Sequence, residues 1–196
     1  MCGIAGFIYS DKDRPVDPET LVAMAAIQYH RGPDGFGYQV IDDRGVGFTH
    51  ARLSIIDLNP ERGRQPFRSP NGQYLIAHNG EFYDYKRLRA DLASRGYQFR
   101  TKSDTELAFA LYERQQDRLT LVRDRFGVKP LYYAQIPGGL VFGSEIKVVL
   151  AHPQVKAQFA SEGLYHQLMQ TMVPGTTCFE GIDAVEPGQK ITVQRR

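Results

Sequence analysis

The sequence lacks the features that mark disulfide-rich, membrane or nucleic-acid-binding proteins. Its 196 residues contain two cysteines, Cys2 and Cys178, which allow one disulfide at most. No apolar run approaches the roughly 20 residues that cross a bilayer, and the apolar N-terminal stretch has no basic region of the signal-peptide type. With 24 Lys and Arg against 22 Asp and Glu, the net charge of +2 indicates no nucleic-acid or membrane partner. We therefore expect a cytoplasmic globular protein.

Motifs for metals and nucleotides are missing as well. No glycine-rich segment fits the dinucleotide fingerprint or ends in Gly-Lys-Ser/Thr. The histidines do not have the spacing of metal ligands, so we predict no metal site; they are His30, His50, His78, His152 and His166. We expect no cofactor in this domain.

What is present indicates one layered domain of strands and helices. The chain is 42% hydrophobic and 23% charged, which suits a folded core. Helices are predicted from Pro18 with Asp17 as the N-cap, after the capping-box pattern Ser103-Asp104-Thr105-Glu106, and at 85–95, 145–150 and 162–172. Strand-like runs lie at 3–9, 36–41, 46–56, 119–122, 131–134, 140–142 and 190–193. Strands and helices in blocks favour a layered domain over a βαβ repeat.

Cys2 is the first candidate for chemistry because it follows the initiator methionine. Removal of Met1 would place a thiol and a free α-amino group on the same residue. An α-amino group titrates at roughly 7.7–8.0, so it could accept the thiol proton, and this pairing is a known way to activate a nucleophile. The alternative is a small buried side chain beside Ile4.

Three further positions could bind substrate, although each also has a structural explanation. The Asn79 amide and the Gly80 N–H could form a two-donor oxyanion hole, or the pair could be a hairpin turn. The Arg52 guanidinium could hold a carboxylate, or it could face water at a strand edge. Asp104 could bind an ammonium group, or it could stabilise a helix N-terminus.

A series of motifs, in order along nearly the whole chain, gives these candidates a common meaning. The chain resembles the N-terminal glutaminase domain of asparagine synthetases, which are class II (N-terminal nucleophile, Ntn) glutamine amidotransferases. The Arg-Leu-Ser-Ile-Ile-Asp and Arg-Asp-Arg-Phe-Gly segments are similar to the asparagine synthetase branch in particular. The matching segments lie at 1–6, 31–35, 51–58, 65–67, 79–81, 103–106, 123–133, 144–147 and 173–175.

The resemblance implies a fold and a reaction. The fold is α+β, a four-layer αββα Ntn-hydrolase sandwich of two antiparallel sheets flanked by helices, and residues 1–196 form one glutamine amidotransferase type 2 domain. Cys2 would attack the side-chain amide of L-glutamine, and Asn79 with the Gly80 N–H would stabilise the oxyanion. Ammonia would leave, and a γ-glutamyl thioester on Cys2 would be hydrolysed to glutamate.

The resemblance also implies how glutamine is held. Arg52 would bind the α-carboxylate, and Glu81 and Asp104 would receive the α-ammonium group. Backbone along the segment after Arg52 would line the site, through Leu53, Ser54, Ile55 and Ile56. One cation and two anions would then select a free amino acid over a peptide.

Family members continue into an ATP-dependent synthetase domain whose Ser-Gly-Gly-x-Asp-Ser loop is not in this sequence. We expect that domain, with its ATP and Mg, in a longer native chain or another subunit, where ammonia would convert aspartate to asparagine. A homo-oligomer is compatible with the sequence. Two alternatives stay open: a tailoring amidotransferase with another acceptor, and a catalytically silent regulatory module.

The segment between Glu106 and Arg123 is shorter than in the family. Residues 107–113 align equally well with the helix that follows the Ser-Asp-x-Glu motif and with the strand that precedes the Arg-Asp-Arg motif. Either a helix and its connection are deleted, or a stretch is left out of the sequence. A true deletion would remove packing near Asp104.

Overall fold

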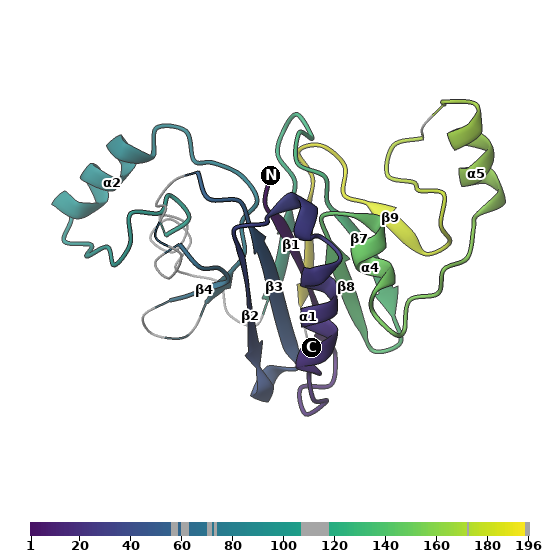
Figure 1. Ribbon diagram of the computed structural model, residues 1–196, viewed down its shortest axis with the longest axis horizontal. Coiled ribbons are helices and arrows are strands. Elements are labelled where there is room, and N and C mark those ends of the chain that lie inside the picture. Colours follow the sequence, from purple (N-terminus) through teal and green to yellow (C-terminus); the bar gives the residue numbers. More distant parts are fainter. Residues whose placement is uncertain are drawn as a thin grey trace.

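A six-stranded antiparallel sheet lies at the centre of the computed structural model, which describes residues 1–55, 59, 63–69, 72, 74–106, 118–171 and 173–194 (Figure 1). Its strand order is β2-β3-β1-β8-β7-β9. The strands are β1 (Gly3–Tyr9), β2 (Gly35–Ile41), β3 (Val46–Arg52), β7 (Tyr132–Ile136), β8 (Gly139–Gly143) and β9 (Ile182–Ala184). The central position of β1 brings the N-terminus into the middle of the fold.

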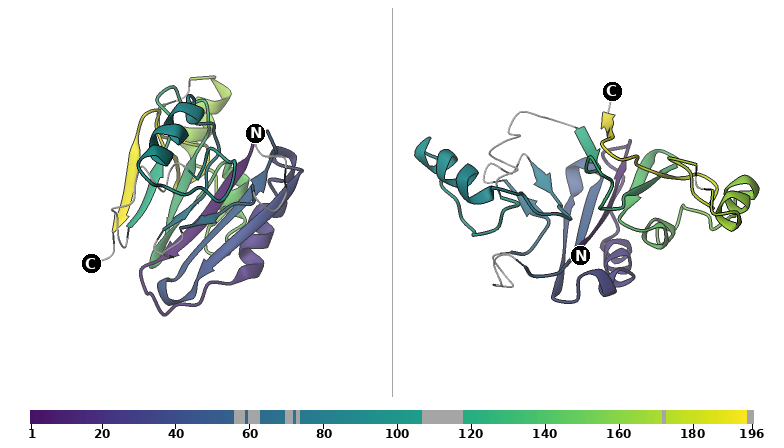
Figure 2. Two further views of the ribbon diagram at one scale, coloured as in Figure 1. Left: turned by 90° about the vertical axis from the view of Figure 1, so that its left-hand side faces the viewer. Right: turned by 90° about the horizontal axis from the view of Figure 1, so that it is seen from above.

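Helices cover one face of this sheet and a second antiparallel sheet covers the other (Figure 2). The helices are α1 (Pro18–Ala26) and α4 (Ile146–Leu150), and the second sheet pairs β10 (Lys190–Gln194) with β6 (Arg118–Val122). Strand β1 supplies Phe7 to the core beneath the helices and Ile8 to the core between the sheets. Successive side chains of a strand point to opposite faces, so burial on both faces explains the unbroken apolar run of β1.

Three elements lie at the periphery. The short hairpin of β4 (Phe67–Arg68) and β5 (Leu75–Ile76) sits beside the central sheet, and α2 (Tyr85–Ser94) and α5 (Ser161–Leu168) project at opposite ends of the molecule (Figure 1). Neither α2 nor α5 has a buried residue. The predicted α+β fold with two antiparallel sheets is confirmed, but α2 lies at the edge instead of covering the second sheet.

Local signals gave some element boundaries correctly and others not. Helix α1 begins at Pro18 as predicted, because the Asp17 carboxylate accepts the backbone N–H groups of Glu19 (3.0 Å) and Thr20 (3.1 Å). The pKa of Asp17 is lowered mainly by a hydrogen bond from the Thr20 hydroxyl and to a smaller extent by these two backbone bonds. The strand expected at 46–56 ends at Arg52, and the helix expected at 162–172 ends at Leu168. Strand β9 was not predicted.

The Ser103-Asp104-Thr105-Glu106 segment is only partly a capping box. The Ser103 hydroxyl oxygen accepts the Thr105 N–H at 3.2 Å, as a cap does. The Glu106 carboxylate, however, accepts the N–H groups of Arg100 and Thr101, each at 2.8 Å, and not that of Ser103. The helix expected after this segment falls on residues 107–117, outside the described residues. Within the described part of the chain, no helix is long and apolar enough to cross a membrane.

Candidate active site

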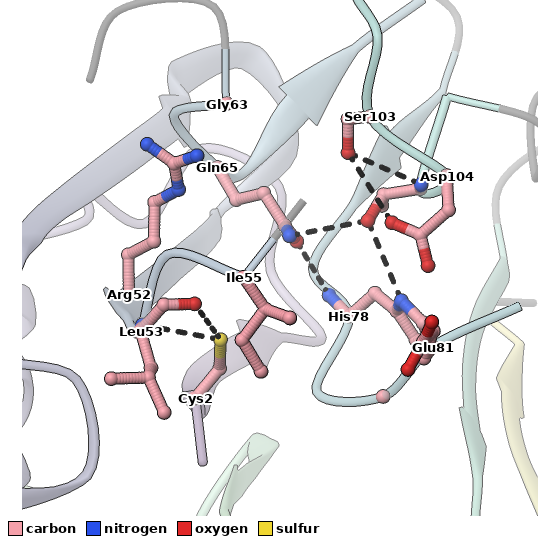
Figure 3. Close-up of a pocket in the computed structure, with 12 residues that line it drawn as sticks. Cys2, Arg52, Leu53, Ile55, Gly63, Gln65, His78, Glu81, Ser103 and Asp104 are labelled. Carbon is pink, nitrogen blue, oxygen red and sulfur yellow. Dashed lines mark hydrogen bonds between the residues drawn. The ribbon is translucent and has the colours of Figure 1, made fainter. Parts of the chain in front are cut away.

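A cleft lies where β1 begins and β3 ends (Figure 3). Because β1 pairs antiparallel with β3, with Gly3 opposite Ala51, the sheet brings Cys2 beside the residues that follow β3. The cleft is lined by Cys2, Arg52, Leu53, Ile55, Gly63, Gln65, His78, Gly80, Glu81, Ser103, Asp104 and Thr105. Seven residues predicted from the sequence therefore line one cleft, although they come from four separate segments.

The Cys2 thiol is half-buried at the base of the cleft. Its Sγ lies 3.3 Å from the Leu53 backbone N–H, which donates to it, and 3.5 Å from the Leu53 carbonyl oxygen. The Cys2 carbonyl accepts a hydrogen bond from Nε of the buried Arg31 at 3.0 Å. Both sides of Cys2 are thus held, by the backbone after β3 and by a side chain from the turn after α1.

Arg31 is in turn held by Glu145, whose Oε1 lies 3.0 Å from Arg31 Nη1. The same carboxylate contacts His30 at 3.0 Å and Lys147 at 3.3 Å. Burial raises the pKa of Glu145, but hydrogen bonds from its three basic partners lower it by more. Glu145 is therefore ionised and holds Arg31 against the Cys2 carbonyl.

Arg52 forms one wall of the cleft, with only 6% of its surface exposed. Its Nη1 donates to the Asn59 carbonyl at 3.0 Å. A Cβ added to Gly63 would lie 1.9 Å from Arg52 Nη2, so a glycine at 63 leaves the space that the guanidinium occupies. The predicted carboxylate-binding residue is thus a buried cation at the cleft and does not face water at a strand edge.

Two carboxylates, Glu81 and Asp104, line the other side (Figure 3). Asp104 is 6% exposed, and its Oδ2 accepts the Phe82 N–H at 2.9 Å. Its Oδ1 lies 3.5 Å from the Ser103 hydroxyl. Glu81 is exposed at the mouth. The cleft therefore has a cation on one wall and two anions on the other. These charges are complementary to the carboxylate and the ammonium group of a zwitterionic amino acid.

Asn79 lies between two lining residues, His78 and Gly80, but is not itself among the lining residues. It belongs to the connection from β5 to α2, so the alternative of a hairpin turn is wrong. The Asn79 Nδ2 group is buried and has no hydrogen-bond partner in the part of the chain described. Because buried donors are nearly always paired, an unpaired one is unusual. The Asn79 amide is therefore available to donate a hydrogen bond to a bound ligand.

Two imidazoles belong to this region: His50 is fully buried, and His78, which directly precedes Asn79, is half-buried. Burial lowers the pKa of His50 to about 4, and burial also lowers the pKa of His78, with the Asp104 charge opposing it. Both rings are therefore neutral at pH 7. His50 Nε2 lies 3.3 Å from the His78 carbonyl oxygen, to which it donates.

Of the two remaining predicted positions, the one that the structure describes does not line the cleft. Ser54 is half-buried, and its N–H donates to Asp34 Oδ2 at 2.7 Å. Ile56 lies outside the described residues. Cys178 is a half-buried free thiol. Among the described residues there is no cluster of three or more His, Cys, Asp or Glu that could hold a metal ion.

Several cleft residues were given no role from the sequence. Gln65 stood in the Gln-Pro-Phe segment of the resemblance, and His78 directly precedes Asn79-Gly80-Glu81, so both carried a positional signal. Arg31 does not line the cleft, and although it stood in the 31–35 segment of the resemblance it was given no role. Its contact with Cys2 joins residues 29 positions apart and depends on the tertiary fold.

Comparisons with known proteins show the family to which this chain is similar. A family model described as "Glutamine amidotransferase domain" matches residues 1–107 and 107–196. The chain is 35% identical to glutamine-hydrolyzing asparagine synthetase 3 of Bacillus subtilis, over all of this chain and 35% of that protein. It is also 35% identical to the amidase chry2 of Gibberella zeae, over 96% of this chain and 32% of that protein.

The fold is also found among known structures. Glutamine phosphoribosylpyrophosphate amidotransferase from B. subtilis is similar with a TM-score of 0.60 and 20% sequence identity, over 76% of this chain and 43% of that one. At that identity the similarity concerns the fold, which is the Ntn-hydrolase fold.

The matches also bear on the interior of the chain. The chain spans about a third of the length of the curated relatives it matches. The family match is divided at residue 107, and the alignment with the B. subtilis synthetase runs over 219 positions, more than the 196 residues here. Both facts agree with a shortened segment after Glu106. From its cleft, its fold and these matches, the chain belongs to the glutamine amidotransferase domain family.

Proposed function

We propose that this domain hydrolyses L-glutamine to glutamate and ammonia with Cys2 as the nucleophile. The observation that carries the proposal is the charge arrangement around the thiol, with the buried Arg52 on one wall and Glu81 and Asp104 on the other. A free amino acid has a carboxylate and an ammonium group on one carbon, so it can satisfy both walls while its side chain extends to Cys2. A peptide-linked glutamine lacks these two charges.

Catalysis requires the prior removal of Met1, which is half exposed and so accessible. The freed α-amino group of Cys2 takes the thiol proton, and Sγ attacks the carbonyl carbon of the glutamine side chain. The tetrahedral oxyanion is stabilised by Asn79 Nδ2 and the Gly80 N–H, at about 3–4 kcal/mol per donor. The C–N bond then breaks, and the proton held by the amino group leaves with ammonia.

The second half of the reaction releases the acyl group. The γ-glutamyl thioester on Cys2 is attacked by water, which gives a proton to the same amino group. The C–S bond breaks, glutamate leaves, and the thiol regains its proton. Each proton taken from a nucleophile is thus returned to a leaving group.

The ammonia feeds an ATP-dependent synthetase domain that converts aspartate to asparagine. Support comes from the relatives, which are named glutamine-hydrolyzing asparagine synthetases and are about three times as long as this chain. ATP and Mg would act in that domain, and this one would need no cofactor. Equal identity to the amidase chry2 favours a second candidate, a tailoring amidotransferase with another acceptor.

Glutamine turnover tests the proposal. The parent chain and Cys178→Ala are expected to release glutamate and ammonia in equal amounts, and Cys2→Ala is expected to release neither. Absence of turnover from a parent chain whose N-terminus is Cys2 would refute glutamine hydrolysis and support the silent regulatory module.

A further inference from the structure

We propose that Gln65 is a positioning residue that couples the loop carrying Asp104 to the segment carrying the oxyanion donors, an inference that rests on the proposed function. Gln65 Oε1 accepts the His78 backbone N–H at 2.8 Å. Its Nε2 donates to the Thr105 hydroxyl oxygen at 3.3 Å. Figure 3 shows the Gln65 side chain reaching across the back of the cleft to His78. We call residues 78–80 the oxyanion segment and residues 103–106 the ammonium loop.

The contacts of Gln65 fix its orientation and require an amide. Because a backbone N–H can only donate, the atom facing His78 must be the acceptor, and the donor NH₂ group faces Thr105. Gln65 is 7% exposed and Thr105 is 2% exposed, so water does not replace these bonds. A neutral amide donates and accepts at the same time, whereas a carboxylate only accepts and an aliphatic side chain does neither.

The oxyanion segment is held at a second point by His50. The carbonyl that accepts from His50 Nε2 belongs to the His78–Asn79 peptide, which is planar. Fixing that oxygen therefore also fixes the direction of the Asn79 N–H and the start of the Asn79 side chain. The His78 ring adds a further contact, since its Nδ1 lies 3.4 Å from the Thr105 hydroxyl.

The ammonium loop is also tied to the other end of the same stretch. Asp104 Oδ2 accepts the Phe82 N–H at 2.9 Å. Asn79, Gly80 and Glu81 are thus bracketed by two ties to one loop, through Gln65 and Thr105 at His78 and through Asp104 at Phe82. A substrate ammonium group that binds Asp104 therefore contacts the same loop that positions the oxyanion donors. Through Gln65, binding of the substrate α-amino group at the ammonium loop is linked to the placement of the donors in the oxyanion segment.

Two substitutions remove the tie without a large change of shape. Gln65→Met keeps the length of the side chain and removes both hydrogen bonds, and Thr105→Val removes only the hydroxyl. We expect each to lower kcat for glutamine about ten-fold or more, with a smaller change in KM, because the oxyanion donors act in the transition state. Thr105→Ser retains the hydroxyl and should lose much less than Thr105→Val.

The matched control is Gln135→Met, the same chemical change at an exposed position on β7 remote in sequence from the cleft residues. We expect it to leave kcat and KM unchanged. A cooperative thermal unfolding transition should be measured for every variant to establish that it is folded. Hydrogen exchange of the peptide covering 78–82 should be faster in Gln65→Met and Thr105→Val than in the parent and in Thr105→Ser.

A double-mutant cycle with Asn79→Ala separates positioning from general stability. If Gln65 acts through the oxyanion segment, Gln65→Met should lower kcat little further once Asn79 is alanine. Additive losses in kcat, or a folded Gln65→Met with the parent's kcat and exchange rates, would overturn the proposal while the parent still hydrolyses glutamine. A parent that is processed to Cys2 but inactive would instead overturn the proposed function, and this inference with it.

Discussion

Replacing Asp104 by asparagine removes one negative charge from the cleft with almost no change of shape. The Asn oxygen can still accept the Phe82 N–H, so the loop should keep its fold. Because Asp104 is 6% exposed, its bond to a substrate ammonium group is poorly screened by water. Hydrogen bonds to charged groups contribute about 1.5–3 kcal/mol, and each 1.4 kcal/mol is roughly ten-fold in affinity. We expect KM for glutamine to rise roughly 10- to 150-fold.

Glu81→Gln is the matched control because Glu81 is exposed at the mouth of the same cleft. Exposed ion pairs contribute about 1 kcal/mol or less, so KM should rise only a few-fold. The assay is glutamate release at increasing substrate concentration, repeated with the glutamine analogue that lacks the α-amino group. Asp104→Asn should raise KM for glutamine far more than for the analogue. Equal effects on both substrates, or an effect no larger than that of Glu81→Gln, would refute ammonium recognition by Asp104.

Three other changes test separate parts of the site and fold. Asn79→Ala should lower kcat about 10²- to 10³-fold with little change in KM, as loss of an oxyanion donor does; a rise in KM alone would point to substrate binding. Gly63→Ala should displace the Arg52 guanidinium and raise KM in steady-state assays, with unfolding temperature nearly constant; a normal KM would contradict the crowding. Stability should fall as pH drops from about 6.5 to 4, since unfolded imidazoles take up protons there while His50 and His152, with pKa values of about 4, do not. Urea unfolding across this range measures the loss, and His152→Gln should reduce its slope.

Elements with strong local signals could be predicted from the sequence. Burial on both faces makes β1 a continuous apolar run, and the Asp17-Pro18 cap sets the start of α1. Strand β9 has three residues, which pair with the first three residues of β7, so it is too short to carry a periodicity of its own. Strand β3 ends at Arg52 while apolar residues continue to 56, because the chain turns there to form the cleft.

The sequence allowed the main residues of the site to be predicted, but not the hydrogen bonds that hold them in place. The order of motifs identified Cys2, Arg52 and Asp104, which line one cleft. Gln65 and Arg31 have no local pattern that distinguishes a buried polar side chain from a turn residue, since their partners come from other segments of the chain. Such contacts arise from tertiary packing, which a single sequence does not record.

The central claim, that Cys2 is an N-terminal nucleophile, is tested most directly by intact-mass measurement before and after treatment with an electrophilic glutamine analogue. We expect the untreated chain to lack Met1 and the treated chain to gain one adduct, which peptide mapping places on Cys2. Cys2→Ala should gain none, and Cys178→Ala should be labelled as the parent is. Full glutaminase activity in a chain that retains Met1, or an adduct on Cys2→Ala, would contradict the claim.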